Sequence, residues 1–449
     1  FKYIKTLSQY TKGRIFKPAK ELQKQILSNL GFELTQGQIE TINDIEKDQN
    51  SQNQMLRLVQ GDVGCGKTLV ALLTSLNIAA AKSQSAIMAP TEVLAQQHYN
   101  FFQNCLDHLG FKTVFLSSKI TGKTRTETLR QIESGEADFI IGTHSLLQEK
   151  VKFRDLAYIV VDEQHKFGVN QRMELISKGI YPDVLIMSAT PIPRSLSLTL
   201  FGDLEISKIM TMPKNRKQIK TFVSSISRIE EVIELIKKHI SRDEKTYWVC
   251  PLIENNQETN ENDYIDVATR FEYLKNHFKD NVIFLHGGLS AEEKIDIIEK
   301  YRSGQAKILV STTGIEVGVD VKDATLIIIE NAEKFGLAQL HQLRGRVGRS
   351  DLESSCILLY GNRTSKIASM RLKIMKESTD GFFIAEQDLK LRGEGDIFGS
   401  KQSGEQSFRF LNLAEDSDLI SLSNKLAKGL GINNDNMILI KIFNPLFNN

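Results

Sequence analysis

The stretch GDVGCGKT at residues 61–68 decides the fold of the first half of this chain. It matches the pattern G-x-x-x-x-G-K-[ST]; the apolar run MLRLVQ (55–60) precedes it, and the run TLVALLTSLNIAAAK (68–82), without Pro or Gly, follows it. A strand before the glycines and a helix after them is the context that supports a phosphate-binding loop (P-loop) over a chance glycine-rich turn. Its backbone N–H groups would wrap phosphates, Lys67 would reach the outer phosphates and Thr68 would hold Mg²⁺. The predicted binding residues are Gly61, Asp62, Val63, Gly64, Cys65, Gly66, Lys67 and Thr68.

Length and composition set the broad class. The 449 residues predict about two or three domains, and 41% hydrophobic with 25% charged residues is typical of a soluble globular protein. The net charge of +2 neither implies nor excludes a nucleic-acid partner. Four widely separated cysteines argue against a zinc site or a disulfide framework, and together with the absence of a signal peptide or a membrane span they predict a cytoplasmic protein. Because the chain begins with Phe1, we expect that an upstream part is missing or has been removed.

Apolar runs alternate with helical patterns in two blocks separated by the polar stretch TMPKNRKQIKT (211–221), which is interpreted as a linker. The runs are apolar throughout, as expected for parallel strands covered on both faces. The predicted fold class is therefore α/β, with two tandem domains built on doubly wound parallel sheets and followed by a C-terminal helical hairpin and loop. The predicted segments are a leader (1–30), domain 1 (31–212), domain 2 (213–364) and the C-terminal region (365–449).

A pair of carboxylates follows the strand candidate IVV (159–161). Asp162 would hold Mg²⁺ together with Thr68, and Glu163 would polarise an attacking water. Carboxylates at this place also cap helices, so the catalytic interpretation depends on the P-loop upstream.

Arginines in QLRGRVGRS (342–350) supply the third element. Arg346 and Arg349 are three residues apart, so on a helix they would share one face and clamp a γ-phosphate presented by the other domain. The alternative is a solvated basic helix. Since domain 2 has no phosphate loop of its own, the arginine-finger interpretation is preferred, with ATP between the two halves.

These motifs, in this order, resemble superfamily 2 helicases. The order continues through APTEVLAQQH (89–98), GTHSLL (142–147), SATPIPRSLSLT (188–199), HGGLSAEEK (286–294) and STTGIEVGVDV (311–321). Within the superfamily, DEQHKFGVNQR (162–172) and TDGFFIAEQDLKLRGEGDIFG (379–399) are similar to RecG helicases. The resemblance implies two RecA-like P-loop domains that use ATP and Mg²⁺. It also implies helicase and translocase activity on branched DNA, stalled forks and Holliday junctions, in recombination and repair. DNA would be the partner, single-strand-binding protein is a further candidate partner, and the chain is expected to act as a monomer.

Site residues carry over from the resemblance position by position. Gln38 would read adenine, and Gln342 would join Arg346 and Arg349 in the catalytic set. The residues implied in DNA contact or in coupling are Thr91, Thr143, Ser188, Thr190, Thr312, Glu316 and Asp320. The glycine-rich stretch LRGEGDIFGSKQSG (391–404) lacks the G-K-[ST] ending, and eight Lys/Arg against six Asp/Glu between 363 and 401 do not make it a basic patch. The resemblance makes it a translocation motif, with Arg371, Arg392 and Gln402 as coupling residues.

The chain also departs from the family pattern. Lys166 replaces the usual Arg, Gly314 a bulky aliphatic residue, Gly288 the Arg of HGRM, and Glu394 the Pro of RGPG. RecG proteins carry an N-terminal wedge domain, whereas only 30 residues precede Gly31 here, so the wedge is expected to be absent. Two alternatives stay open: a double-stranded DNA translocase like the transcription-repair coupling factor (Mfd), and a truncated remnant that binds DNA or ATP without fork specificity.

Overall fold

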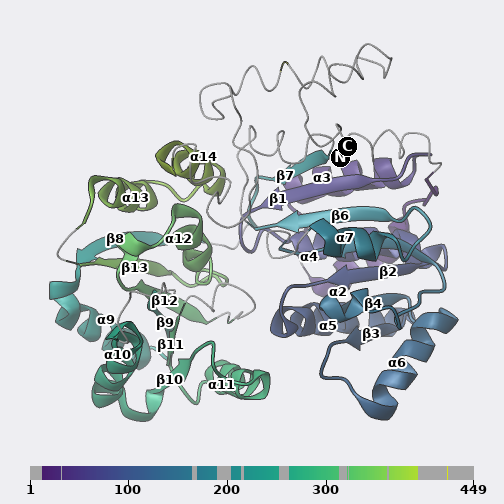
Figure 1. Ribbon diagram of the computed structural model, residues 1–449. Coiled ribbons are helices and arrows are strands. Elements are labelled where there is room, and N and C mark those ends of the chain that lie inside the picture. Colours follow the sequence, from purple (N-terminus) through teal and green to yellow (C-terminus); the bar gives the residue numbers. More distant parts are fainter. Residues whose placement is uncertain are drawn as a thin grey trace, which may run out of the picture.

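Two α/β domains lie side by side, each built on one sheet, in the computed structural model of the chain (Figure 1). The structure describes residues 13–31, 33–163, 169–189, 204–213, 217–251, 262–312, 321, 323–361, 364–392 and 422. All strand pairs in both sheets are parallel, as the uniformly apolar runs predicted.

The first sheet has seven strands among the described residues, in the order β3-β4-β2-β5-β6-β1-β7. Its strands are β1 Leu56–Gly61, β2 Gln84–Met88, β3 Thr113–Leu116, β4 Phe139–Gly142, β5 Leu156–Val161, β6 Asp183–Ser188 and β7 Glu205–Ile209. The accompanying helices are α2 Lys20–Leu30, α3 Gln36–Gln49, α4 Lys67–Ala80, α5 Glu92–Leu106, α6 Gly122–Ser134 and α7 Val169–Ile176. Part of the predicted leader belongs to this domain, because Phe16 and Ile26 are buried in its core.

The second sheet has six strands among the described residues, in the order β10-β11-β9-β12-β13-β8. Its strands are β8 Lys220–Ser225, β9 Lys245–Val249, β10 Val282–Leu285, β11 Ile308–Ser311, β12 Ala324–Ile329 and β13 Ser355–Tyr360. The helices are α9 Ile229–Ser241, α10 Asn262–Phe278, α11 Ala291–Ser303 and α12 Leu337–Arg344. The edge strand β8 begins inside the stretch interpreted as a linker, so that interpretation was wrong for its last two residues.

A helical hairpin follows the second sheet, as predicted. It consists of α13 Lys366–Glu377 and α14 Gly381–Arg392, and it packs on α12 and β8 (Figure 1). The face of α13 that enters the core carries Ala368, Leu372 and Met375. Ile367 and Met370 lie on another face and are exposed.

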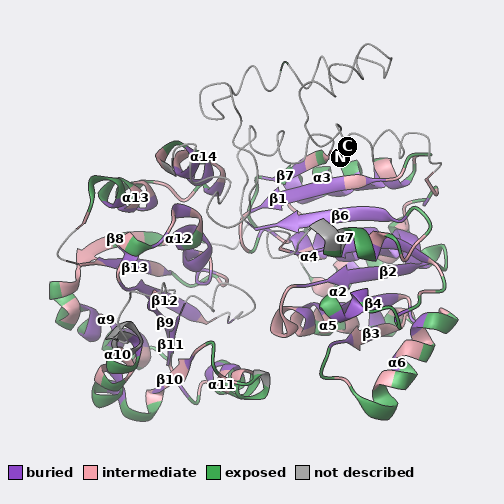
Figure 2. Cartoon of the chain, in the orientation of Figure 1, coloured by how far each residue is buried: buried purple, intermediate pink, exposed green. Residues whose placement is uncertain are grey.

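Alternating residues of each interior strand enter different cores. In β1, Val59 belongs to the cluster packed against α3 and α4, whereas Leu58 belongs to the cluster on the opposite face of the sheet. The strands are accordingly buried while the outer faces of the helices are exposed (Figure 2). Both faces of a doubly wound sheet are thus covered, and burial of this apolar area is the main stabilising term.

Parallel strands bring the motifs to one edge of the first sheet. In the strand register Gln60 pairs with Ser188, and Met88 pairs with both Gly142 and Val161. The segments that follow β1, β2, β4, β5 and β6 therefore all leave the sheet at its carboxyl edge, where open α/β sheets bind their ligands.

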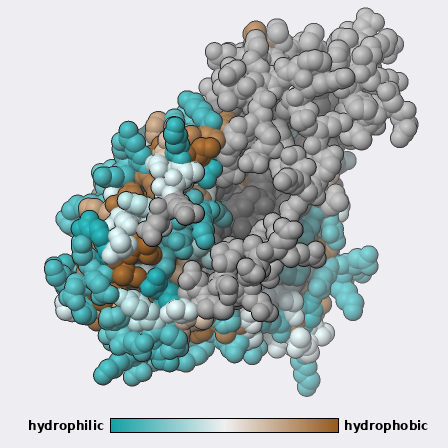
Figure 3. Space-filling model, turned by 60° about the vertical axis from the view of Figure 1, so that its left-hand side comes forward, coloured by the Kyte–Doolittle hydropathy of each residue, from teal (hydrophilic) through white to brown (hydrophobic). Residues whose placement is uncertain are grey.

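Hydrophilic surface dominates the described atoms on the side of the second domain, interrupted by smaller hydrophobic patches (Figure 3). All four cysteines are free and buried. Within the described part of the chain, no helix has the length and apolar character needed to cross a membrane.

Candidate nucleotide site between the two sheets

The P-loop joins the carboxyl end of β1 to the first turn of α4, as the sequence predicted. Gly64 and Gly66 have φ angles of 80° and 90°, so successive N–H groups curl toward one point, an arrangement that binds anions. Lys67 is buried, and its Nζ donates to the carbonyl oxygens of Gly61 at 2.6 Å and Asp62 at 3.0 Å. The loop thus places an ammonium group and a helix N-terminus together, which favours a phosphate chain.

Gln38 holds the P-loop from the side of α3. Its Oε1 accepts a hydrogen bond from the N–H of Thr35, whose hydroxyl accepts from the N–H of Gln38, so the two residues form a capping box. Its Nε2 donates to the Cys65 carbonyl oxygen at 2.8 Å. The residue predicted to read adenine therefore lies against the P-loop with its amide fixed on both sides.

Asp162 follows β5 and is held by a histidine that the sequence analysis did not single out. His98 Nε2 lies 2.8 Å from Asp162 Oδ2, and both side chains are buried. Because an ionised carboxylate only accepts, the histidine donates from Nε2. Burial raises the pKa of Asp162, but the His98 bond and the charge of Lys67 outweigh it, so the pKa is lowered. The available signal was the position of His98 in APTEVLAQQH; a histidine on a helix points to no role by itself.

Glu163 occupies a strained position beside Asp162. Its φ of 51° lies in the left-handed region, which costs a non-glycine residue about 1 kcal/mol or more. Burial and the neighbouring Asp162 charge raise the pKa of Glu163, whereas the charges of Lys67 and Arg346 lower it, and the net shift is upward. A raised pKa suits a carboxylate that takes a proton from water.

Arg346 reaches this site from the second domain. It is buried, and its charge acts directly on Glu163. The prediction that Arg346 and Arg349 share a helix face was wrong: α12 ends at Arg344, and Gly348, with a φ of 70°, lies in the turn that follows. Arg349 Nε instead donates to the Gly345 carbonyl oxygen at 3.2 Å. Gln342 is buried on α12.

The residues implied in DNA contact occupy strand ends and caps. Thr91 caps α5 by accepting a hydrogen bond from the Leu94 N–H. The side chains of Thr143, Ser188 and Thr312 are buried, so any phosphate contact of these segments would have to use backbone N–H groups. Arg371 lies half-buried on α13. The predicted residues Lys166, Thr190, Gly314, Glu316, Asp320, Glu394 and Gln402 lie outside the described residues, as does the side chain of Arg392.

The charges fit a metal-bound polyphosphate. The half-buried Thr68 lies in the first turn of α4 next to Lys67, and Asp162 is ionised within range of the Lys67 charge. The described residues contain no cluster of three or more His, Cys, Asp or Glu side chains that could ligate a metal ion. Mg²⁺ commonly binds through one or two protein groups, with phosphate and water completing its shell. Thr68 and Asp162 match that pattern.

Comparison with protein families divides the chain as the folds do. The DEAD/DEAH box helicase family matches residues 35–198, and the helicase conserved C-terminal domain matches residues 209–351. A third family, described as ATP-dependent DNA helicase RecG, domain 3, C-terminal, matches residues 378–441.

Two relatives that match nearly the whole chain are both RecG helicases. The ATP-dependent DNA helicase RecG of Borreliella burgdorferi is 43% identical over 425 residues, which cover 93% of this chain and 62% of that protein. The RecG of Escherichia coli K12 is 42% identical, over 91% of this chain and 59% of that protein. The chain thus spans about three fifths of the length of these relatives. A structure of RecG bound to a three-way DNA junction superposes with a TM-score of 0.76 at 37% identity, over 94% of this chain and 55% of that chain. By sequence, fold and domain order, the chain belongs to the RecG family.

Proposed function

We propose that this chain is the ATP-driven motor of a RecG-type DNA helicase. ATP binds between the two sheets, and its hydrolysis moves the motor along the duplex of branched DNA such as stalled forks and Holliday junctions. The observation that carries the proposal is that buried Arg346, in the second domain, acts by its charge on Glu163 beside the P-loop of the first. A cation supplied across a cleft makes hydrolysis depend on the relative position of two domains, which a motor requires.

Each residue has a distinct part in hydrolysis. Lys67 and the P-loop N–H groups bind the phosphates, and Gln38 fixes the loop and contacts adenine. Glu163 orients the attacking water and takes its proton. Arg346, with Arg349 and Gln342 beside it, neutralises charge that develops on the γ-phosphate.

Mg²⁺ would be held by Thr68 and Asp162. When bound, it would neutralise charge on the phosphate oxygens. His98 fixes the orientation of the Asp162 carboxylate, so the ligand is in place before nucleotide arrives.

The DNA side of the proposal is supported by the three-way-junction complex of the RecG relative and by the match of residues 378–441 to RecG domain 3. Thr91, Thr143 and Thr312 place their segments at the sheet edges for contacts with the sugar-phosphate backbone, which fix register without reading sequence. Ser188, Thr190, Glu316 and Asp320 link those contacts to the cleft. Arg371, Arg392 and Gln402 transmit the movement to the duplex.

The RecG relatives and the RecG domain 3 match favour this function over an Mfd-like translocase. The presence of Lys67, Asp162, Glu163 and Arg346 in one site argues against a remnant without turnover.

The test is steady-state ATP hydrolysis with no DNA, with linear duplex and with a forked junction of equal length. We expect DNA to stimulate the rate and the fork to stimulate it most. Lys67→Ala should abolish hydrolysis, whereas Lys47→Ala, an exposed lysine at the end of α3, should leave it unchanged. A rate that is independent of DNA, or equal in Lys67→Ala and the unsubstituted chain, would refute the function.

A further inference from the structure

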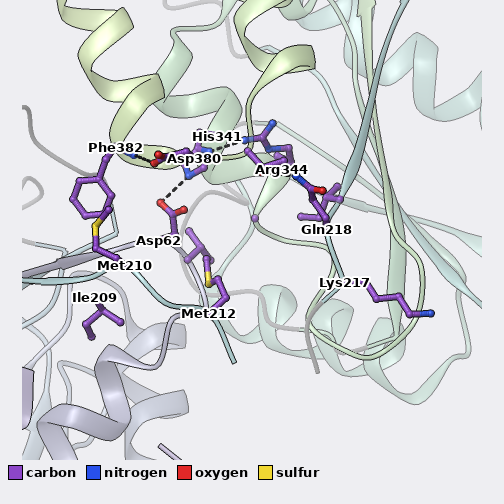
Figure 4. A pocket seen from close by; sticks show the side chains of 14 residues that line it. Asp62, Ile209, Met210, Met212, Lys217, Gln218, His341, Arg344, Asp380 and Phe382 are labelled. Carbon is purple, nitrogen blue, oxygen red and sulfur yellow. Dashed lines mark hydrogen bonds and ion pairs between the residues drawn. The ribbon is translucent and has the colours of Figure 1, made fainter. Parts of the chain in front are cut away.

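The P-loop carboxylate Asp62 contacts the second domain. Its Oδ1 lies 2.9 Å from His341 Nε2 of α12 (Figure 4). The N–H of Gly381, the first residue of α14, also donates to this carboxylate. Burial raises the pKa of Asp62, but the His341 bond, the charge of Lys67 and the Gly381 N–H outweigh it and lower the pKa. The carboxylate is thus ionised where three parts of the chain meet: the P-loop, α12 and the hairpin.

Hydrogen-bond roles along this contact are fixed by an arginine. Arg344 Nη2 lies 2.9 Å from His341 Nδ1, and a guanidinium only donates, so Nδ1 is the acceptor. The neutral imidazole then carries its proton on Nε2 and donates it to Asp62. The order Arg344 to His341 to Asp62 is therefore a polarised chain in which each bond strengthens the next.

The same arginine fastens the first helix of the hairpin. Arg344 is 2% exposed, and its Nη1 donates to the carbonyl oxygens of Met375 and Ser378, each at 2.8 Å. These carbonyls belong to the last turn of α13 and its cap, where a cation is favoured by the helix dipole. The chain from Asp62 therefore extends to the end of α13.

The second helix begins directly on the P-loop carboxylate. Asp380 accepts hydrogen bonds from the N–H groups of Phe382 and Phe383, and the Gly381 N–H goes to Asp62. Two carboxylates thus satisfy the first N–H groups of α14, one from its own turn and one from the other domain. A Cβ on Gly381 would lie 1.9 Å from Asp62 Oδ1 and 2.6 Å from His341 Nε2, so no side chain fits while this contact is closed.

Other contacts between the described parts of the two domains lie beside this junction. A Cβ on Gly345 would lie 2.9 Å from the Cβ of Val63, so the end of α12 also touches the P-loop closely. Lys208 of β7 lies over the Phe382 ring at 5.0 Å. A cavity of about 440 Å³ opens beside these contacts, lined by both domains and by the start of α14 (Figure 4). The Asp62 contacts therefore lie beside a void, and polar contacts there cost less to open than a filled apolar interface.

We propose that Asp62 is a positioning residue through which the P-loop controls the helical hairpin: its bonds to His341 and Gly381 close in one nucleotide state and open in another. The proposal rests on the function proposed above and specifies the route from the nucleotide to the hairpin. A change at the phosphates moves the P-loop, Asp62 moves with it, and the first turn of α14 and the last turn of α13 follow.

The sharpest test is a matched pair at His341. His341→Gln places an amide N–H near the position of Nε2 and keeps the bond to Asp62. His341→Asn leaves an acceptor near the position of Nδ1 for Arg344 but does not reach Asp62. Both are compared by the number of base pairs moved per ATP hydrolysed. We expect His341→Gln to retain the native ratio and His341→Asn to lower it about 5- to 100-fold, the range of a typical coupling free energy.

The second variant, Gly381→Ala, acts from the hairpin side. Because the native cysteines are buried, cysteines introduced at Lys47 on α3 and Glu386 on α14, both exposed, accept a donor and acceptor dye selectively. In the otherwise unsubstituted chain the distance between the dyes should change when the non-hydrolysable analogue AMP-PNP binds. In Gly381→Ala it should be longer without nucleotide and should respond less to AMP-PNP.

The outcomes separate this inference from the function on which it rests. No ATPase in the unsubstituted chain would contradict the proposed function. DNA-stimulated ATPase with the native coupling ratio in His341→Asn, or with the native distance change in Gly381→Ala, would overturn this inference alone.

Discussion

Both sheets place buried carboxylates at their carboxyl edges, but the partners of these carboxylates differ. At the first edge, Asp162 is bound by His98, and the pKa of Glu163 stays raised even though Lys67 and Arg346 are near. At the second edge, Glu330 follows β12, accepts from Arg270 at 2.8 and 2.7 Å and accepts from Trp248 Nε1 at 2.8 Å. At the first edge the pKa of Glu163 is shifted upward, whereas at the second edge Glu330 forms a buried ion pair with Arg270.

This difference shows that the two domains use their buried charged residues for different tasks. In the second sheet the buried ion pair fixes α10 to β9 and β12, a structural task. The cation that we propose for the chemistry of the first sheet lies instead in the turn after α12, where the charge of Arg346 acts on Glu163. Substitutions at the first edge should therefore change rates, and substitutions at the second should change stability.

The largest expected effect is on Arg346. We expect Arg346→Ala to lower kcat for ATP hydrolysis by about 10³- to 10⁵-fold, because an arginine finger acts on charge that develops in the transition state. Arg228→Ala, an exposed arginine of the same domain paired on the surface with Glu231, is the control. Steady-state hydrolysis at saturating DNA measures both; a kcat for Arg346→Ala within a few-fold of the control would disprove the role.

Substitutions at the carboxyl edge of the second sheet should lower the stability of the fold. Glu330→Gln leaves Arg270 mostly buried without its counter-charge and should lower the free energy of unfolding by about 3 kcal/mol. Trp248, the one tryptophan of the chain, contacts Glu330, so its fluorescence in a urea titration reports this domain. Glu353→Gln, which removes an exposed ion pair with Lys220, should change the midpoint little. Equal midpoints for the two variants would contradict this account.

His98 should show a smaller effect on rate. His98→Ala removes the group that orients Asp162, and we expect about a 10- to 100-fold loss of kcat with a higher Mg²⁺ requirement, as for other residues behind a metal ligand. His98→Gln, whose amide N–H takes the position of Nε2, should recover most of the loss. The rate of ATP hydrolysis, measured across a Mg²⁺ titration, tests this expectation. Full activity of His98→Ala would exclude the positioning role.

The smallest expected effect lies far from both edges, at Asp183. Burial raises the pKa of Asp183 to about 7 from its ordinary value of 3.8, while the Met55 N–H bonds to its Oδ1. The folded chain therefore keeps this proton while the unfolded chain loses it, so stability falls as pH rises from about 4 to about 7. Asp183→Asn should remove this dependence and stabilise the chain at pH 8 by on the order of 1 kcal/mol. Urea unfolding at pH 5 and pH 8 tests it; the same pH dependence in both proteins would show the assignment to be wrong.

Most strands could be predicted from sequence, including the edge strands β3 and β10, but the edge strands β7 and β8 could not. The apolar runs at 158–163 and 324–330 correspond to β5 and β12, which are buried on both faces. The segments of β7 and β8, each at one edge of its sheet, were missed because their residues are mixed in polarity and mostly exposed or half-buried. The hydrophobic pattern that identifies a central strand is absent at such an edge.

The motif residues of the site were predictable, and their supporting contacts were not. Lys67, Asp162 and Glu163 follow strands at recognisable spacings, so their meeting at one edge follows from parallel pairing. The roles of His98, His341 and Gly381 could not be predicted from sequence. Each depends on an aspartate, Asp162 or Asp62, that lies 64, 279 and about 320 positions away. Arg346 and Arg349 were wrongly predicted to lie on a helix, because the spacing of two arginines does not reveal that α12 ends at Arg344.

We propose above all that Arg346 of the second domain completes the chemistry at the edge of the first sheet. It is tested most directly by the affinity of ADP with aluminium fluoride, which mimics the transferring phosphoryl group, compared with the affinity of AMP-PNP, which mimics bound ATP. For Arg346→Ala we predict a loss of at least about 100-fold for the aluminium fluoride complex and little change for AMP-PNP, because the arginine acts in the transition state. Equal changes in the two affinities, or none in either, would contradict it.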